Sequence, residues 1–224
     1  EVLKYFKKDL QQQRLKFPEL AEPRRVYYQF GAQLDKIFMR SIELIKNFKY
    51  TRYMPLLYLK NSDPQEVTGQ RNLGRFMRIL LVKRLESSFY AFKMTLNRFI
   101  HSYDSFIKML DKGTIYISKQ HSEKIYEALE NDDINRIMEL VEQDKVQKYE
   151  SGDFSKSFRE HLKEDLDILL EMKKSWDGVG ADPKIDQFKS ILAKDKILKE
   201  NKLIIFTESK ETAEYLDKNL REEF

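Results

Sequence analysis

The 224-residue sequence contains no cysteine, only seven glycines and only five prolines. The lack of cysteine excludes disulfides, thiol catalysis and cysteine-ligated zinc, and it is typical of a reducing cytoplasm. No apolar run approaches the roughly 18 residues that a membrane-spanning helix needs, so we expect no membrane contact. Because glycine and proline are scarce while leucine, lysine and glutamate are plentiful, the composition predicts a mainly α-helical protein.

Catalytic motifs are also missing. The sequence has no Gly-x-x-x-x-Gly-Lys-Ser/Thr phosphate loop and no Gly-x-Gly-x-x-Gly fingerprint. The histidines His101, His121 and His161 lie far apart in the sequence, and none has a second ligand at helical metal spacing. We interpret acidic pairs such as Asp132–Asp133 and Glu164–Asp165 as solvated helix faces rather than as paired catalytic carboxylates. The chain by itself is therefore predicted to catalyse no reaction and to hold no cofactor or metal ion.

The positive charge is concentrated in the first half of the chain. Residues 1–112 carry 22 basic and 11 acidic side chains, whereas residues 113–224 carry 19 and 26. A contact with nucleic acid is therefore expected in the first half.

The stretch Gln70–Ile100 has two faces at helical spacing. No proline or interior glycine interrupts it between Arg75 and Lys112, so one continuous helix is predicted over 70–112. That helix would be about 60 Å long at about 1.5 Å per residue, and a helical bundle would pack around it. Its apolar face comprises Leu81, Leu85, Ser88, Phe92, Leu96 and Phe99. Its basic residues are interpreted as phosphate contacts or, more simply, as a solvated face: Arg71, Arg75, Arg78, Lys83 and Arg84.

The rest of the chain divides into shorter predicted elements. Helices are expected over residues 1–15, 32–47, 50–60, 122–130, 133–144, 155–176, 183–199 and 209–220. The helix over 155–176 would bury Phe158, Leu162, Leu166, Leu169, Leu170 and Met172. Extended segments are expected over 24–30, 114–118 and 202–207, the last as a buried parallel strand, and a polar loop over 61–68. The glycine-rich stretch 177–183 is the predicted domain boundary.

Four of these stretches resemble the Swi/Snf family of superfamily-two helicases. KLIIFTESKETAEYL resembles motif IV at the start of the second RecA-like lobe. DPKIDQFKSIL resembles the helix that leads into that lobe, with Lys184 at the family's lysine and Asp182–Pro183 in place of its Ser-Gly. LKFPELAEPRRVYYQFGAQLDKIF resembles the family's exit from the first lobe, and FMRILLVKRLESSFYAF is similar to a stretch of bacterial members, including those associated with RNA polymerase.

The resemblance implies a part of an ATP-dependent translocase on double-stranded DNA. Residues 1–30 would leave the first lobe, 31–177 would form a helical insertion, 178–183 a linker, and 184–224 an α-β-α piece that begins the second lobe. The phosphate loop, the magnesium-binding acids and the arginine fingers would lie outside this chain, so ATP and Mg would bind the longer parent, a nucleoid-associated protein of the cytoplasm. Motif IV residues contact the tracking strand in the family, which points to Thr207, Ser209 and Lys210.

Two other interpretations remain open. The chain can be a stand-alone helical nucleic-acid-binding module, or an interaction scaffold that docks a partner such as RNA polymerase through the aromatic stretch Tyr50–Tyr58 and the acidic residues 121–150. Two residues also have simple structural alternatives. Ser209 can be a helix cap, and Arg84 can pair with Glu86 or with an acid of a neighbouring helix.

Overall fold

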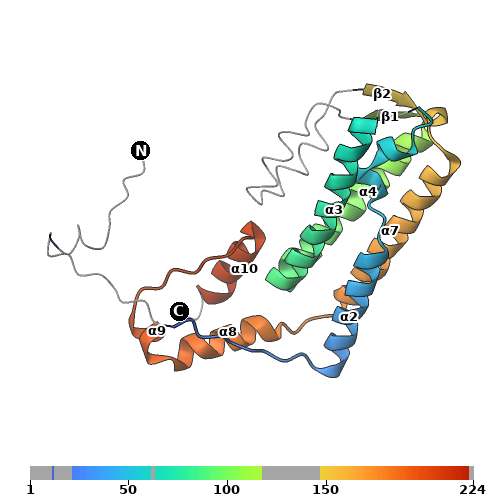
Figure 1. Cartoon of the computed structure of the whole chain (residues 1–224). Helices are drawn as coiled ribbons and strands as arrows, with labels where there is room; N and C mark the ends of the chain where they lie inside the picture. The colour runs from blue at the N-terminus through green and yellow to red at the C-terminus, as the bar shows by residue number, and fades with distance from the viewer. Residues whose placement is uncertain (1–11, 13–21, 62–63, 118–146, 222–224) are drawn as a thin grey trace.

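The computed structural model describes residues 12, 22–61, 64–117 and 147–221, which are mainly helical (Figure 1). Two short strands, β1 (Thr114–Ile117) and β2 (Gln147–Glu150), pair antiparallel. Three 3₁₀ turns occur at η1 (Thr51–Tyr53), η2 (Pro55–Tyr58) and η3 (Ser151–Asp153). The α-helices of the described chain are α2 (Ala32–Asn47), α3 (Pro64–Ser87), α4 (Phe89–Asp111), α7 (Lys156–Asp177), α8 (Pro183–Lys194), α9 (Lys196–Glu200) and α10 (Lys210–Leu220).

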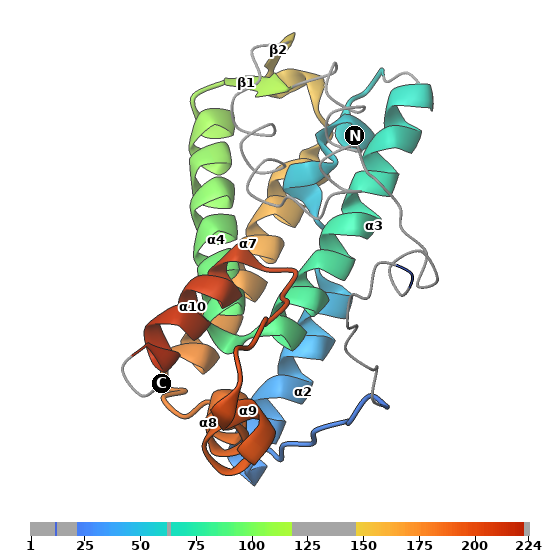
Figure 2. The same ribbon diagram turned by 90° about the vertical axis from the view of Figure 1, so that its left-hand side faces the viewer.

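The helices α2, α3, α4 and α7 lie side by side around one apolar core (Figures 1 and 2). Trp176 of α7 is fully buried and packs on Phe89 and Phe92 of α4, with ring centroids 4.8 and 5.4 Å apart. Its indole N–H donates to the hydroxyl of Ser41 on α2 at 2.8 Å. Buried aromatic contacts and the hydrogen bond of the Trp176 indole therefore join α7 to α4 and to α2.

The predicted continuous helix over 70–112 is wrong, because the chain breaks at Ser88. Ser88 has extended backbone angles (φ −158°, ψ 153°), and its Oγ accepts the Ala91 N–H at 3.1 Å as the N-cap of α4. The Nζ of Lys184 donates to the carbonyls of Glu86 and Ser87 at 2.7 and 2.8 Å, which satisfies the C-terminal end of α3. The result is a hairpin in which α4 returns alongside α3 (Figure 2).

Three other helix predictions that fall on described residues are confirmed, those for α2, α7 and α10, whereas the short helix predicted over 50–60 is the pair of 3₁₀ turns η1 and η2. The bounds of α2 are those expected, α7 begins one residue after its predicted start, and α10 begins after a Ser209 cap that accepts the Thr212 N–H at 3.2 Å. The helix predicted over 183–199 is divided at Asp195, whose carboxylate caps α9. The loop predicted over 61–68 is wrong beyond residue 63, since α3 already begins at Pro64. On α7, Leu170 is 44% exposed and was wrongly expected to face inward.

The predicted parallel strand over 202–207 is also wrong for this structure. The segment forms no strand, and Ile204 and Phe206 are 81% and 89% exposed. A strand needs a neighbour for its backbone N–H and C=O groups, and no described segment pairs with this one. Residues 24–30 likewise form no strand. The helices predicted over 122–130 and 133–144, and nearly all of the one predicted over 1–15, lie outside the described residues.

A buried carboxylate fixes the turn that follows α2. Asp165 of α7 is fully buried, and its two oxygens accept the N–H of Lys49 at 2.7 Å, the N–H of Thr51 at 2.8 Å and the Tyr103 hydroxyl at 3.0 Å. Between the two backbone donors, Tyr50 adopts a left-handed conformation with φ 61°, which costs free energy in a residue other than glycine. The carboxylate stabilises that turn. The prediction that Glu164 and Asp165 both lie on a solvated helix face is therefore wrong for Asp165, which is buried.

We expect Asp165→Asn to lower the free energy of unfolding by about 1–3 kcal/mol. An amide has one accepting oxygen, so one of the three donors would face the amide NH₂ without an acceptor. Urea denaturation measures the change, and Asp167→Asn on the exposed face of the same helix is the matched control. Equal stability of the two variants would contradict this role for Asp165.

Candidate nucleic-acid interface

Three arginines form an exposed row in the middle of α3. Arg71, Arg75 and Arg78 are all exposed and follow one another at helical spacing, whereas Met77, Leu80, Leu81 and Leu85 lie on a neighbouring face that is buried in the core. None of the three makes an ion pair with any residue that the structure describes. The Arg78 guanidinium carbon lies 5.7 Å from the ring centroid of buried Tyr50, within cation–π range. We call these three residues the basic row.

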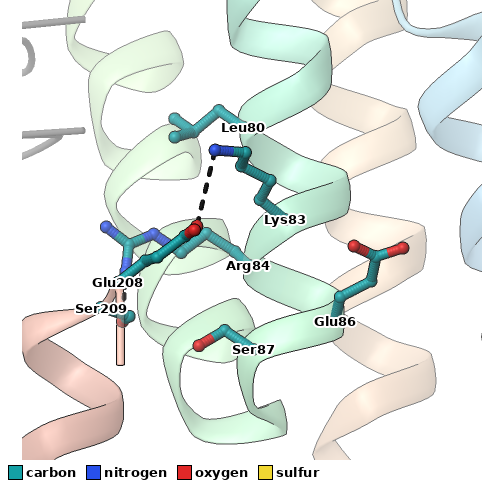
Figure 3. A pocket seen from close by; sticks show the side chains of 7 residues that line it. All are labelled: Leu80, Lys83, Arg84, Glu86, Ser87, Glu208 and Ser209. Atoms are coloured by element: carbon teal, nitrogen blue, oxygen red, sulfur yellow. Dashed lines mark hydrogen bonds and ion pairs between the residues drawn. The ribbon is translucent and has the colours of Figure 1, made fainter. Parts of the chain in front are cut away.

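Lys83 lies further along α3 and already has an acidic neighbour. Its Nζ is 3.5 Å from the Glu208 carboxylate, in a pair whose side chains are 46% and 74% exposed (Figure 3). The pair borders a cavity of about 360 Å³ lined by Leu80, Lys83, Arg84, Glu86, Ser87, Glu208 and Ser209. Two carboxylates in that lining offset the positive charge of Lys83 and Arg84. The cavity is therefore a weaker anion site than the basic row.

Arg84 and Ser209 are buried rather than available to a phosphate at the surface. Arg84 is 4% exposed and Ser209 is 2% exposed. The Arg84 guanidinium donates to the Ser209 hydroxyl and to the Glu211 carboxylate, the latter at 3.0 Å. Both residues therefore have the structural roles that the sequence left open. Ser209 is the N-cap of α10. Arg84 pairs with Glu211, an acid of another helix, and not with Glu86.

These buried groups belong to a larger set that we call the polar junction. The second oxygen of Glu211 accepts from Arg98 of α4 at 2.5 Å. The Thr212 hydroxyl lies 2.8 Å from that of Ser87 and 2.9 Å from that of Ser88. The junction joins α10 to the end of the hairpin where α3 meets α4 (Figure 2). Its members are Arg84, Ser87, Ser88, Arg98, Ser209, Glu211 and Thr212.

The remaining predicted contacts, Thr207 and Lys210, are exposed. The Thr207 hydroxyl accepts the Ser209 N–H at 3.3 Å, and the Lys210 Nζ is 3.8 Å from the Glu214 carboxylate. The structure thus brings Lys83 and the start of α10 together, whereas the basic row lies on a different part of α3. Sequence reasoning missed the contacts that Glu211 and Thr212 make with the α3–α4 hairpin, and it missed Arg98 as one of their partners.

The aromatic stretch Tyr50–Tyr58 does not offer the docking surface that the scaffold interpretation needs. Tyr50, Tyr53 and Leu56 are each no more than 2% exposed and belong to the core. Of the acidic stretch 121–150 in that interpretation, residues 121–146 lie outside the described residues. Between Leu203 and Phe206, by contrast, four consecutive apolar side chains are 42–89% exposed.

Charge at the polar junction stabilises the ionised form of Glu211. Burial by itself raises the pKa of this carboxyl, but the hydrogen bond from Arg98 and the positive charges of Arg84 and Arg98 outweigh it and lower the pKa. Burial lowers the pKa of Lys184, whose ammonium caps α3, against the opposing effect of Asp182 and Glu86.

The described residues contain no group of three or more His, Cys, Asp or Glu side chains arranged to hold a metal ion. Among the helices of the described ranges, none has the length and hydropathy to cross a membrane. The chain matches no protein-family model, no curated protein and no solved structure. The resemblance to Swi/Snf enzymes therefore stays a prediction.

We expect Glu211→Gln to lower the free energy of unfolding by about 3 kcal/mol at pH 7, because the change removes the ion pairs that the buried carboxylate makes with Arg84 and Arg98. Glu214→Gln on the exposed side of α10 is the control, and we expect it to change stability by less than about 0.5 kcal/mol. Chemical denaturation measures both changes. A Glu211 variant as stable as the Glu214 variant would show that the buried ion pairs contribute nothing.

The same variant has a defined pH dependence. Because the pKa of Glu211 is lower in the folded than in the unfolded state, its contribution is complete above the unfolded pKa of about 4.3 and is lost as the pH falls through the folded value. We therefore expect the stability difference between the natural chain and Glu211→Gln to shrink between pH 6 and pH 3. Denaturation curves at both ends of that range measure it, and a constant difference would contradict the ion-pair account.

Proposed function

We propose that this chain is the helical inter-lobe part of a Swi/Snf-type DNA translocase, and that the basic row contacts the phosphate backbone of duplex DNA. The observation that carries the proposal is the exposure of Arg71, Arg75 and Arg78 on one helix without a described ion-pair partner. Elsewhere in the described chain, Arg40, Arg159 and Arg221 are also exposed, but each pairs with an acid. An unneutralised row is suited to an anionic partner.

The spacing of the row supports contacts with neighbouring phosphates. From Arg71 to Arg78 the helix rises about 10 Å at about 1.5 Å per residue, roughly three steps of 3.4 Å along one strand of DNA. Arginine guanidinium groups bind phosphate oxygens through two parallel N–H donors. Such contacts hold a duplex in place without reading its sequence, as a translocase requires.

The charge distribution along α3 supports contact at the basic row. Glu86 and Glu208 lie near Lys83 at the other end, where they would repel phosphate. Within the proposal, Lys83 and Lys210 are therefore peripheral contacts, and Thr207 is an exposed hydroxyl beside them. Arg84 and Ser209 act through the polar junction instead.

In the same proposal, α2, α3, α4 and α7 form the helical bundle of the insertion. Residues 184–224 are the α-β-α start of a RecA-like lobe, in which Lys202–Thr207 becomes a strand when neighbouring strands are supplied. ATP and magnesium bind the longer parent, and this part relays movement between its lobes. The exposed apolar segment Leu203–Phe206 supports this assignment, because a strand of a parallel sheet is covered on both faces and is therefore apolar on both.

The test is duplex binding by the 224-residue chain across a salt series. We expect log affinity to fall linearly with log salt, at about 0.9 per phosphate contact. We expect the triple variant Arg71→Ala, Arg75→Ala, Arg78→Ala to bind more weakly at all salt concentrations, with the slope reduced by roughly 2–3.

The matched control removes three other exposed arginines, by Arg40→Ala, Arg159→Ala and Arg221→Ala, and so changes the net charge equally. Circular dichroism checks that both variants fold. Equal losses in the two variants would show a non-specific charge effect. Absence of binding by the natural chain at about 50 mM salt would contradict DNA contact through this surface.

A further inference from the structure

The two predicted domains, residues 31–177 and residues 184–224, are joined by side-chain contacts as well as by the linker at residues 178–183. One carboxylate, that of Glu211, binds both helices of the hairpin at once. Its Oε2 accepts from Arg84 of α3 at 3.0 Å, and its Oε1 accepts from Arg98 of α4 at 2.5 Å. The side chains of Glu211 and Arg84 are 4% and 5% exposed, so solvent screens their ion pair little, whereas Arg98 is 34% exposed.

A second set of contacts ties α8 and α10 to the same end of the hairpin. The Tyr215 hydroxyl of α10 donates at 3.1 Å to Asp182, the N-cap of α8. The Tyr215 ring stacks on Tyr90 of α4, with centroids 5.3 Å apart and planes 6° from parallel. The Lys184 ammonium of α8 caps α3 through two carbonyls. The two helices after the linker that contact the hairpin, α8 and α10, are therefore each bound to it by polar side chains of their own.

The linker itself is also held. The Nζ of Lys93 on α4 donates to the Val179 carbonyl at 2.7 Å, and Val179 packs against the core. A free hinge at residues 178–183 would have to break this contact together with those of the polar junction. Releasing Glu211 would break its ion pairs with two arginines, one of which, Arg84, is buried. Partial release is thus unfavourable, and the junction is either closed or open.

We infer that Glu211 is a latch that makes the α3–α4 hairpin, α8 and α10 one rigid body, so that the hinge of this protein does not lie in residues 178–183. A rotation of the C-terminal segment then carries the basic row with it. The inference concerns the motion of the chain and holds whether or not the basic row binds DNA.

Distance measurement between two spin labels tests the latch. Because the natural chain has no cysteine, His101→Cys on α4 and Lys218→Cys on α10 can be labelled alone, and both positions are exposed. We expect one narrow distance distribution in this background. We expect Glu211→Gln to broaden the distribution at least twofold, while Glu214→Gln leaves it unchanged.

A second variant covers the case in which Glu211→Gln does not fold. Arg98→Met removes one of the two arginine contacts at a side chain that is 34% exposed, and we expect it to broaden the distribution as well. A broad distribution in the labelled chain without further substitution would overturn the rigid body. A narrow distribution in every folded latch variant would overturn the role of Glu211. Neither outcome depends on DNA binding, so failure of the latch and failure of the proposed function are distinguishable.

Discussion

The extended backbone of Ser88 is the constraint on which the arrangement of this protein depends. By leaving the helical conformation at one residue, the chain turns α3 into α4 and brings their apolar faces against each other and against α7. The Ser88 hydroxyl accepts the N–H of Ala91 in the first turn of α4 and also lies within hydrogen-bond distance of the Thr212 hydroxyl of α10. One small polar residue therefore both shapes the hairpin and supplies part of the surface on which the C-terminal helix docks.

Burial separates the arginines of α3 into two functional classes. Arg71, Arg75 and Arg78 point to solvent, where a guanidinium keeps its hydration until a phosphate replaces it. Arg84 is taken out of water and must be compensated inside the protein, as the Glu211 carboxylate does at 3.0 Å. The same residue type on the same helix is thus exposed at Arg71, Arg75 and Arg78 and buried in the polar junction at Arg84, and its position relative to the core decides which.

The sequence predicts elements better than it predicts partners. The bounds of α2 and α7 follow from apolar periodicity and the α10 cap from Ser209, all of which are local signals. The break at Ser88 was missed because the apolar stripe keeps its spacing across it, both halves facing one core. The strand over 202–207 failed because its pairing groups need a neighbour that the described chain does not supply. The contacts of Glu211 join residues 113 and 127 positions apart, for which a single sequence carries no signal.

The central claim, that the basic row of α3 faces DNA, is tested most directly by photo-crosslinking. A benzophenone amino acid replaces Asn72, which is exposed beside Arg71 and Arg75, or replaces Asp167 on the exposed face of α7. Both proteins are irradiated with a duplex of about 20 base pairs at low salt. The account predicts a DNA adduct at position 72 and none at position 167. Equal adducts at both positions, or bound duplex without an adduct at position 72, would contradict it.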